Sequence, residues 1–100
     1  MAYERLVQKL TKENLWLYIL RMLSEEPDYP LGLKRKFLKR FGFEPATITF
    51  YIVLYRLKKE GLVSSKMEGG RTIYSCTKRG AEELARGVGF LSETCTKLKL

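Results

Sequence analysis

Apolar residues recur at helical intervals through the first part of the chain. One stripe of such residues predicts a helix that begins at Thr11, as its N-cap, and ends near Ser24, before prolines that cannot continue it. The stripe consists of Leu15, Ile19, Leu20 and Leu23. A shorter amphipathic helix is expected over residues 1–10, with an apolar face formed by Tyr3, Leu6, Val7 and Leu10.

The next helix, expected over residues 31–41, is strongly basic. Its inward face is predicted to be Leu33, Phe37, Leu38 and Phe41. Around this face stand Lys34, Arg35, Lys36, Lys39 and Arg40, with no acid among them. Because no acidic residue interrupts this basic set over residues 31–41, we expect these cations to contact phosphates. The alternative is a solvated face whose long stems cover apolar surface.

A further helix is predicted over residues 46–60, between a turn at Pro45 and a stop signal at Gly61. The apolar side of this helix consists of Phe50, Val53, Leu54 and Leu57. The opposite arc is apolar as well, since it carries Ile48, Ile52 and Tyr55. An exposed apolar arc either reads bases or packs against another chain.

After Gly61 the pattern changes from helical to alternating. Residues 62–67 and 72–77 are β-prone runs, and the Gly69-Gly70 pair between them permits the positive φ angles of a hairpin turn. Thr77 then caps a final helix. Over residues 81–98 its apolar positions recur every four and then three residues, which is the spacing of a coiled-coil seam. The seam consists of Leu84, Val88, Leu91, Cys95 and Leu98.

This order of elements predicts an α+β fold that is mostly α. We expect a winged helix-turn-helix with a two-stranded β-hairpin as its wing and with flanking N- and C-terminal helices. One hundred residues suffice for a single domain over 1–100, with a core at about 12–84. The flanking segments, 1–10 and 81–98, are the expected dimerisation helices.

Charge and chemistry narrow the function. The chain has 19 Lys and Arg against 11 Asp and Glu, a formal net charge of +8, which favours a polyanionic partner over a merely solvated cationic surface. It has no His, and Cys76 and Cys95 lack metal-ligand spacing, so no catalytic site, metal or cofactor is predicted. Cys95 is expected either as a reduced buried thiol or as an intersubunit disulfide.

Nothing in the hydropathy pattern predicts contact with a membrane. No apolar run approaches the roughly 18 residues that span a bilayer, and residues 1–14 are too polar for a secretory leader. We therefore expect an intracellular, cytoplasmic protein.

From about residue 15 to 84 the motifs resemble the PadR-like family of winged-helix transcription regulators, including its small archaeal and archaeal-virus members. The resemblance is carried by Thr49-Phe50-Tyr51, Leu54, Leu57, Glu60-Gly61-Leu62-Val63, Gly69-Gly70-Arg71, Tyr74 and Thr77-Lys78-Arg79-Gly80. The chain departs from the family in a longer turn over 42–49 and in Leu31-Gly32-Leu33, where many members have His-Gly-Tyr. The resemblance implies a homodimeric regulator that binds double-stranded DNA.

In a helix-turn-helix the second helix of the pair enters the major groove, so residues 46–60 are the expected recognition helix. Its threonine hydroxyls are expected to hydrogen-bond bases or phosphates, and its isoleucines to pack on thymine methyl groups. The wing, about 66–72, is expected on the backbone or in the minor groove, although Arg71 could instead be a solvated turn residue. The predicted DNA contacts are Lys34, Arg35, Lys36, Lys39, Arg40, Thr47, Ile48, Thr49, Tyr51, Ile52, Arg56, Lys66 and Arg71.

The dimer is expected to form through the terminal helices. The predicted dimerisation residues are Tyr3, Leu6, Leu10, Leu84, Val88, Leu91, Cys95 and Leu98. A different class of function stays open: a non-catalytic protein-interaction adaptor on the same fold, in which the arc of Ile48, Ile52 and Tyr55 holds a protein partner. The sequence assigns no operator and no effector.

Overall fold

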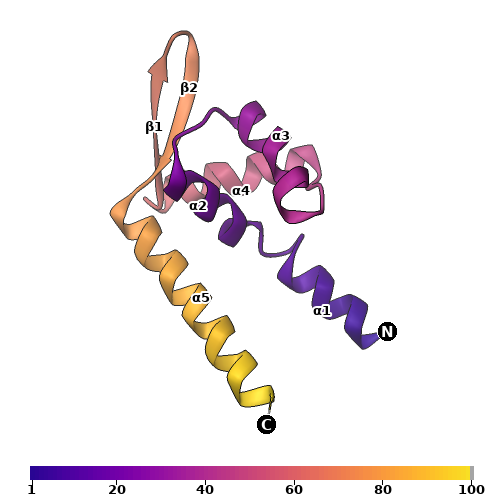
Figure 1. Ribbon diagram of the computed structural model, residues 1–100. Coiled ribbons are helices and arrows are strands. Elements are labelled where there is room, and N and C mark those ends of the chain that lie inside the picture. The colour runs from indigo at the N-terminus through magenta and orange to yellow at the C-terminus, as the bar shows by residue number, and fades with distance from the viewer. Residues whose placement is uncertain (100) are drawn as a thin grey trace.

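The computed structural model describes residues 1–99 and confirms the winged helix-turn-helix fold. Within these residues it has five helices and two strands (Figure 1). They are α1 (Ala2–Leu10), α2 (Leu15–Glu25), α3 (Pro30–Phe41), α4 (Thr47–Lys59), β1 (Val63–Glu68), β2 (Arg71–Cys76) and α5 (Lys78–Leu98). None of these helices combines the length and the apolar character that crossing a bilayer requires.

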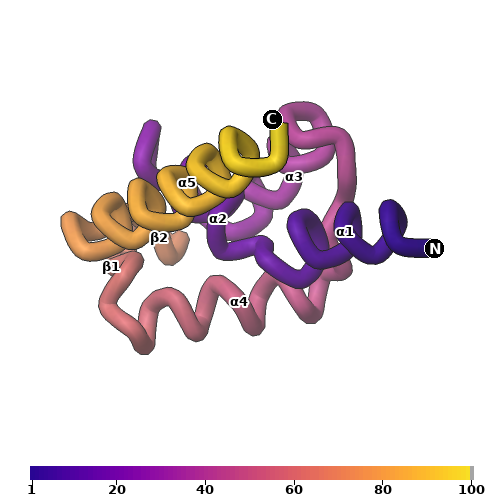
Figure 2. The backbone as a smooth tube through the Cα atoms, turned by 90° about the horizontal axis from the view of Figure 1, so that it is seen from below, coloured from indigo at the N-terminus to yellow at the C-terminus, as the bar shows by residue number. Residues whose placement is uncertain are grey.

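Helix α2 is the centre of the fold, and it lies between α4 and α5 (Figure 2). The predicted stripe of α2 is buried, joined by Met22, and packs against apolar residues of α3, α4 and β1. Beside it, the rings of Tyr18, Phe37, Phe41 and Phe43 meet edge to face or tilted, with centroids 4.9–5.9 Å apart. Burial of these rings fixes α3 against α2.

Two details of the predicted helices are wrong. Leu38 is not on the inward face of α3 but 49% exposed, because Leu33, Phe37 and Phe41 already form the i, i+4, i+8 stripe and Leu38 is turned about 100° away from Phe37. Thr11 does not cap α2 but ends α1, since its hydroxyl donates to the Val7 carbonyl at 2.6 Å. The N-cap position of α2 is Asn14.

The wing is a regular antiparallel hairpin. Its strands pair from Val63↔Cys76 to Glu68↔Arg71, and Gly69 and Gly70 form the turn with φ angles of 57° and 77°. Positive φ at both central residues is the geometry that suits the twist of a two-residue hairpin. Figure 1 shows the wing projecting at one end of the molecule, with both termini at the other.

The connection between α2 and α3 attaches the base of the wing to the helices. Asp28 and Tyr74 exchange two backbone hydrogen bonds, of 3.0 and 2.8 Å, so that Asp28 extends the sheet by one bridge.

The first turn of α5 packs closely against the end of the α4–β1 turn. As predicted, the Thr77 hydroxyl caps α5, accepting from the Gly80 amide at 3.0 Å. A Cβ at Gly80 would lie 2.1 Å from the Leu62 carbonyl oxygen, so only glycine fits there.

Candidate nucleic-acid interface

Helix α4 buries one side and leaves the other open. Phe50, Leu54 and Leu57 are buried in the core. On the opposite side Ile48 is 76%, Ile52 49% and Tyr55 62% exposed, as the sequence predicted. We call these three residues the α4 outer face. Together with Thr47, Tyr51, Arg56 and Lys59 they line an open hollow of about 590 Å³. The floor of this hollow is apolar, and the cations Arg56 and Lys59 stand at the rim nearest the C-terminal end of α4.

The wing contributes a cation held against an aromatic ring. The Arg71 guanidinium carbon lies 4.3 Å from the centroid of the Tyr29 ring, within the range of a cation–π interaction. Arg71 and Tyr29 line a hollow of about 340 Å³ with Pro30, Leu31, Tyr51, Thr72 and Tyr74. Because Tyr51 lines this hollow and the one on α4, the α4 outer face and strand β2 of the wing form one continuous surface.

Tyr29 is the residue that the sequence analysis missed. It precedes α3 at the N-cap position, and its side chain lies over the first turn of that helix because Gly32 has no Cβ. A Cβ at Gly32 would stand 3.0 Å from the Tyr29 ring and 2.7 Å from a carboxylate oxygen of Asp28. The glycine inside the predicted helix was the available signal, because a helical glycine often marks a close approach.

Three of the five cations of α3, Lys34, Lys36 and Arg40, are bound to carboxylates, contrary to the expectation from their spacing. Lys36 Nζ lies 3.0 Å from Glu26 Oε1 and 2.9 Å from Asp28 Oδ2, and Arg40 holds the carboxylate of Glu25 with both guanidinium nitrogens. These acids come from the end of α2 and its connection to α3, eight to fifteen residues away. Inspection at a spacing of four residues therefore could not find them.

The pKa values reflect this pairing. The hydrogen bond from Arg40 lowers the pKa of Glu25, and hydrogen bonds from Lys36 to Asp28 and Glu26 raise the pKa of the lysine. Both groups therefore keep their charges at neutral pH, so titration does not break these ion pairs there.

The predicted cations thus divide into two groups. Paired with carboxylates are Lys34 (with Glu44, 3.3 Å), Lys36, Arg40 and Lys66 (with Glu68, 3.4 Å). Within residues 1–99 no ion pair involves Arg35, Lys39, Arg56 or Arg71. The second group is the one whose charge is available to an external anion.

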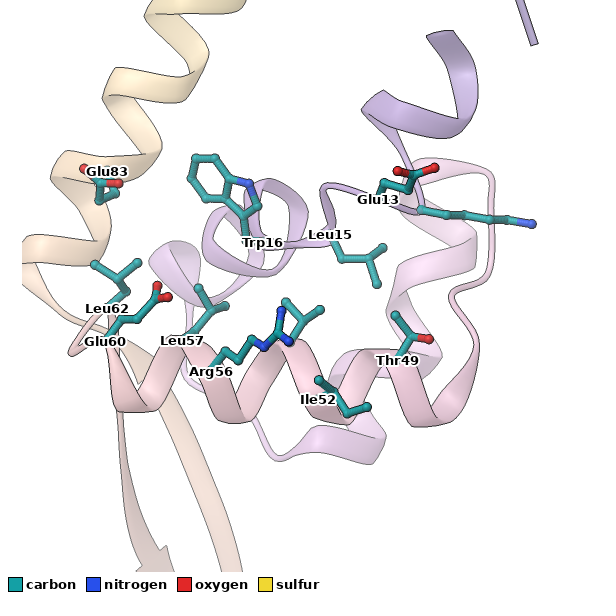
Figure 3. A pocket seen from close by; sticks show the side chains of 12 residues that line it. Glu13, Leu15, Trp16, Thr49, Ile52, Arg56, Leu57, Glu60, Leu62 and Glu83 are labelled. Carbon is teal, nitrogen blue, oxygen red and sulfur yellow. The ribbon is translucent and has the colours of Figure 1, made fainter. Parts of the chain in front are cut away.

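A third hollow, of about 600 Å³, lies on the inner side of α4 (Figure 3). It is enclosed by α2, α4 and the start of α5, with Trp16 as one wall and Leu62 at the α4–β1 turn. Its polar lining is mixed in charge, consisting of Lys12, Glu13, Arg56, Glu60 and Glu83. Thr49, Ile52 and Arg56 line it too, so any occupant would contact three of the predicted DNA-contacting side chains.

The terminal helices expose the residues predicted for dimerisation, with one correction. Tyr3, Leu6, Val88 and Leu98 are exposed, and Leu10 and Leu91 are half-buried. Leu84, however, is only 4% exposed and belongs to the core of its own chain, because the first turns of α5 pack on α2. It is therefore removed from the predicted seam.

Both thiols are free in the chain. Cys95 is exposed, which leaves it available to a second copy and differs from the buried thiol that one alternative expected. Cys76 is half-buried, and burial raises the pKa of its thiol. Residues 1–99 contain no cluster of three or more His, Cys, Asp or Glu that could hold a metal ion.

Comparison with known families gives one match. The model of the transcriptional regulator PadR-like family matches residues 19–86. The structure is similar to a PadR family transcriptional regulator from Eggerthella lenta, with 26% identity over 97% of this chain and 88% of that one and a TM-score of 0.81. A PadR-like transcriptional regulator from Bacillus cereus is 28% identical, over 91% and 95% of the two chains, with a TM-score of 0.75.

A third similar structure is RosR from H. salinarum, which is 28% identical over 86% of this chain and 76% of that one, with a TM-score of 0.66. Among curated proteins no match to the chain was found.

Proposed function

Since this chain belongs to the PadR-like family of transcriptional regulators, we propose that it is a homodimer that binds specific sequences of double-stranded DNA. In this role it acts in the cytoplasm and without catalysis. The observation that carries the proposal is the continuous surface that runs from the α4 outer face through Tyr51 to Arg71 on the wing. That surface has an apolar centre and unpaired cations at its edges.

The second helix of a helix-turn-helix pair lies in the major groove, with its N-terminal residues against base edges. In this chain that helix is α4, which presents Thr47, Ile48, Thr49 and Ile52 to the bases. Tyr51 and Arg56 are placed beside them for phosphate contact. The pairing of the α3 cations reduces the predicted phosphate contacts to Arg35, Lys39, Arg56 and Arg71.

The wing supplies the second point of attachment. Stacking on Tyr29 restricts the Arg71 side chain, so less conformational entropy is lost when its guanidinium meets a phosphate or enters a narrow minor groove. Because Asp28 ties β2 to the α2–α3 connection, the position of Arg71 relative to α4 is set by the fold.

The exposed apolar residues of the terminal helices support the proposed dimer. In α1 no residue is buried, although Tyr3, Leu6 and Val7 form an apolar side, and Val88 and Leu98 are exposed on α5. Isolated amphipathic helices of this kind are stabilised by packing against a partner. A twofold dimer of such chains is expected to bind half-sites about 34 Å apart, one turn of DNA.

The test is the salt dependence of binding to duplex fragments enriched from a random pool. With four cations in each protomer neutralising about eight phosphates per dimer, log K should fall against log salt with a slope of about −7. Binding measured by fluorescence anisotropy between low and moderate salt gives this slope. Affinity independent of salt, or no enriched fragment at low salt, would contradict DNA binding.

The exposed apolar face of α4 also favours a second candidate, a protein-interaction adaptor. Two single variants separate the candidates. Loss of DNA affinity in both Ile52→Asp and Arg71→Ala, with the dimer intact, supports the regulator. Dissociation of a protein assembly by Ile52→Asp alone supports the adaptor.

A further inference from the structure

We infer that α4 recognises its operator through the 5-methyl groups of thymine. The specificity of the protein would then depend on where thymines lie in the major groove, with little contribution from bidentate hydrogen bonds. This inference rests on the proposed function, because it concerns the bases that the same surface contacts.

The chemistry of the exposed residues on α4 limits how they can read bases. From the start of the helix to Tyr55, ahead of Arg56, they are Thr47, Ile48, Thr49, Tyr51, Ile52 and Tyr55. Bidentate reading of guanine uses Arg or Lys, bidentate reading of adenine uses Asn or Gln, and cytosine is read by Asp or Glu. None of these residue types is present among the six. Single hydroxyl groups remain, and they donate or accept with little preference between bases.

The exposed apolar side chains of α4 lie on one line along the helix. Ile48, Ile52 and Tyr55 follow one another at spacings of four and three, so they lie on one line along the helix. Their exposed fractions of 76, 49 and 62% show that this chain does not cover them. Only thymine presents a methyl group in the major groove, and apolar contact is the way in which that methyl is read.

Two cations border this apolar line. The hollow that the α4 outer face lines has Arg56 and Lys59 at one rim, and neither is bound in an ion pair within residues 1–99. An apolar floor beside free cations matches a major groove, where methyl groups lie between two phosphate backbones. A purely apolar protein partner would leave those cations without a counter-charge. DNA supplies that counter-charge through its phosphates, so DNA is the occupant that fits this hollow.

The wing points to the same base composition. A minor groove distinguishes A·T from G·C pairs but little more, and narrow A·T tracts attract arginine. Arg71, stacked on Tyr29, is the side chain available for that contact. Both parts of the surface therefore favour A·T pairs. Contact of α4 with the thymine methyl group also distinguishes A·T from T·A.

The test selects binding sequences in parallel from two versions of one random duplex pool. One version is amplified with thymidine triphosphate and the other with deoxyuridine triphosphate in its place. Uracil pairs as thymine does but lacks the methyl group. We expect a sequence motif rich in A·T pairs to be enriched from the thymine pool and not from the uracil pool. In the enriched duplex, replacing one contacted thymine by uracil should weaken binding about fourfold, as expected for one buried methyl group.

Two variants identify the side chains responsible. Ile52→Ala should weaken binding and remove the difference between thymine and uracil at its own position, because the contact is already lost. Lys59→Ala should weaken binding to both duplexes equally, since it acts on the backbone. Both residues are exposed on the helix surface, so circular dichroism should show an unchanged fold.

The outcomes are distinct. Enrichment of one motif from both pools with equal affinity would overturn thymine-methyl recognition and leave sequence-specific DNA binding intact. Failure to enrich any motif from either pool would overturn both, and would assign the α4 outer face to a protein partner. Enrichment from the thymine pool alone, with loss of discrimination in Ile52→Ala, supports the inference.

Discussion

The two helices of the helix-turn-helix differ in the relation between their sequence and their available charge. Helix α3 carries five cations, three of which are bound to carboxylates from α2, its connection to α3 and the α3–α4 turn. Helix α4 has no charge before Arg56, yet Arg56 and Lys59 are unpaired within residues 1–99. The number of cations in a segment therefore does not measure how strongly that segment attracts DNA.

The α3 ion pairs have a structural role instead. Lys36 binds Asp28, whose carboxylate is largely buried and whose backbone pairs with the wing. The lysine thereby neutralises a charge that would be costly to leave unpaired. We infer that Lys36 and Arg40 of α3 mainly fix the α2–α3 connection and the wing, while Arg35 and Lys39 join α4 and Arg71 in meeting the nucleic acid.

The largest effect should come from an acidic residue on the α4 outer face. Ile52 and Leu38 are equally exposed, at 49%, and stand on α4 and α3 respectively. We expect Ile52→Asp to reduce affinity for the enriched operator by at least about a hundredfold, because it places an anion in the groove and removes an apolar contact. Leu38→Asp, the matched control, should change affinity by less than about fivefold. Equal losses in titrations of the two variants would remove the distinction between the helices.

On the wing, Arg71 should matter more than Lys66. Arg71 is stacked on Tyr29 and unpaired within residues 1–99, whereas Lys66 shares its charge with Glu68. Arg71→Ala should weaken operator binding about tenfold and Lys66→Ala about twofold. Tyr29→Leu, which keeps Arg71 but removes its ring, should fall between them. A Tyr29→Leu variant that binds like the unaltered protein would show that stacking does not help.

Within α3, two lysines provide a matched pair. Lys39 is exposed and has no ion-pair partner in residues 1–99, while Lys36 lies between two carboxylates. Lys39→Ala should make the salt slope shallower by about 2, one phosphate contact for each protomer of the dimer, and Lys36→Ala should leave it nearly unchanged. Glu25→Gln should steepen it by releasing Arg40. These slopes come from affinity titrations at several salt concentrations, and a Lys36→Ala slope that equals the Lys39→Ala slope would contradict the pairing.

The smallest expected effect is on stability against pH. The hydrogen bond from Arg40 lowers the pKa of Glu25 below its ordinary value of 4.5. A carboxyl with a lowered pKa stabilises the folded state above the unfolded pKa, and that contribution is lost as pH falls through the folded pKa. Thermal denaturation should therefore show Glu25→Gln with a Tm lower by at most a few degrees at about pH 7, and with a difference that shrinks as the pH falls below 4.5. A difference that persists in acid would need another cause.

Periodicity was enough to predict most of the fold. The stripe of α2, the two sides of α4, the glycine pair of the wing and the Thr77 cap all depend on residues close in sequence, and the structure confirms them. The errors arose where one position had two local roles. Thr11 can cap a following helix or end the preceding one, and here it ends α1.

The candidate site was predicted in part only. The exposed arc of α4 follows from a helical wheel, so Ile48, Ile52 and Tyr55 were found. Tyr29 was not, because its contact with Arg71 joins residues 42 positions apart. The assignment of Leu84 to a dimer seam failed for a related reason, since its spacing fits both a seam and the packing of α5 on α2.

The sequence by itself determined the elements, their order, the family and the excess of positive charge, because these depend on local spacing and composition. Only the tertiary structure decided which charges are available. An ion pair between Arg40 and Glu25, or a stack of Arg71 on Tyr29, forms when separate segments are brought within a few ångströms, and that distance is set by packing of the core.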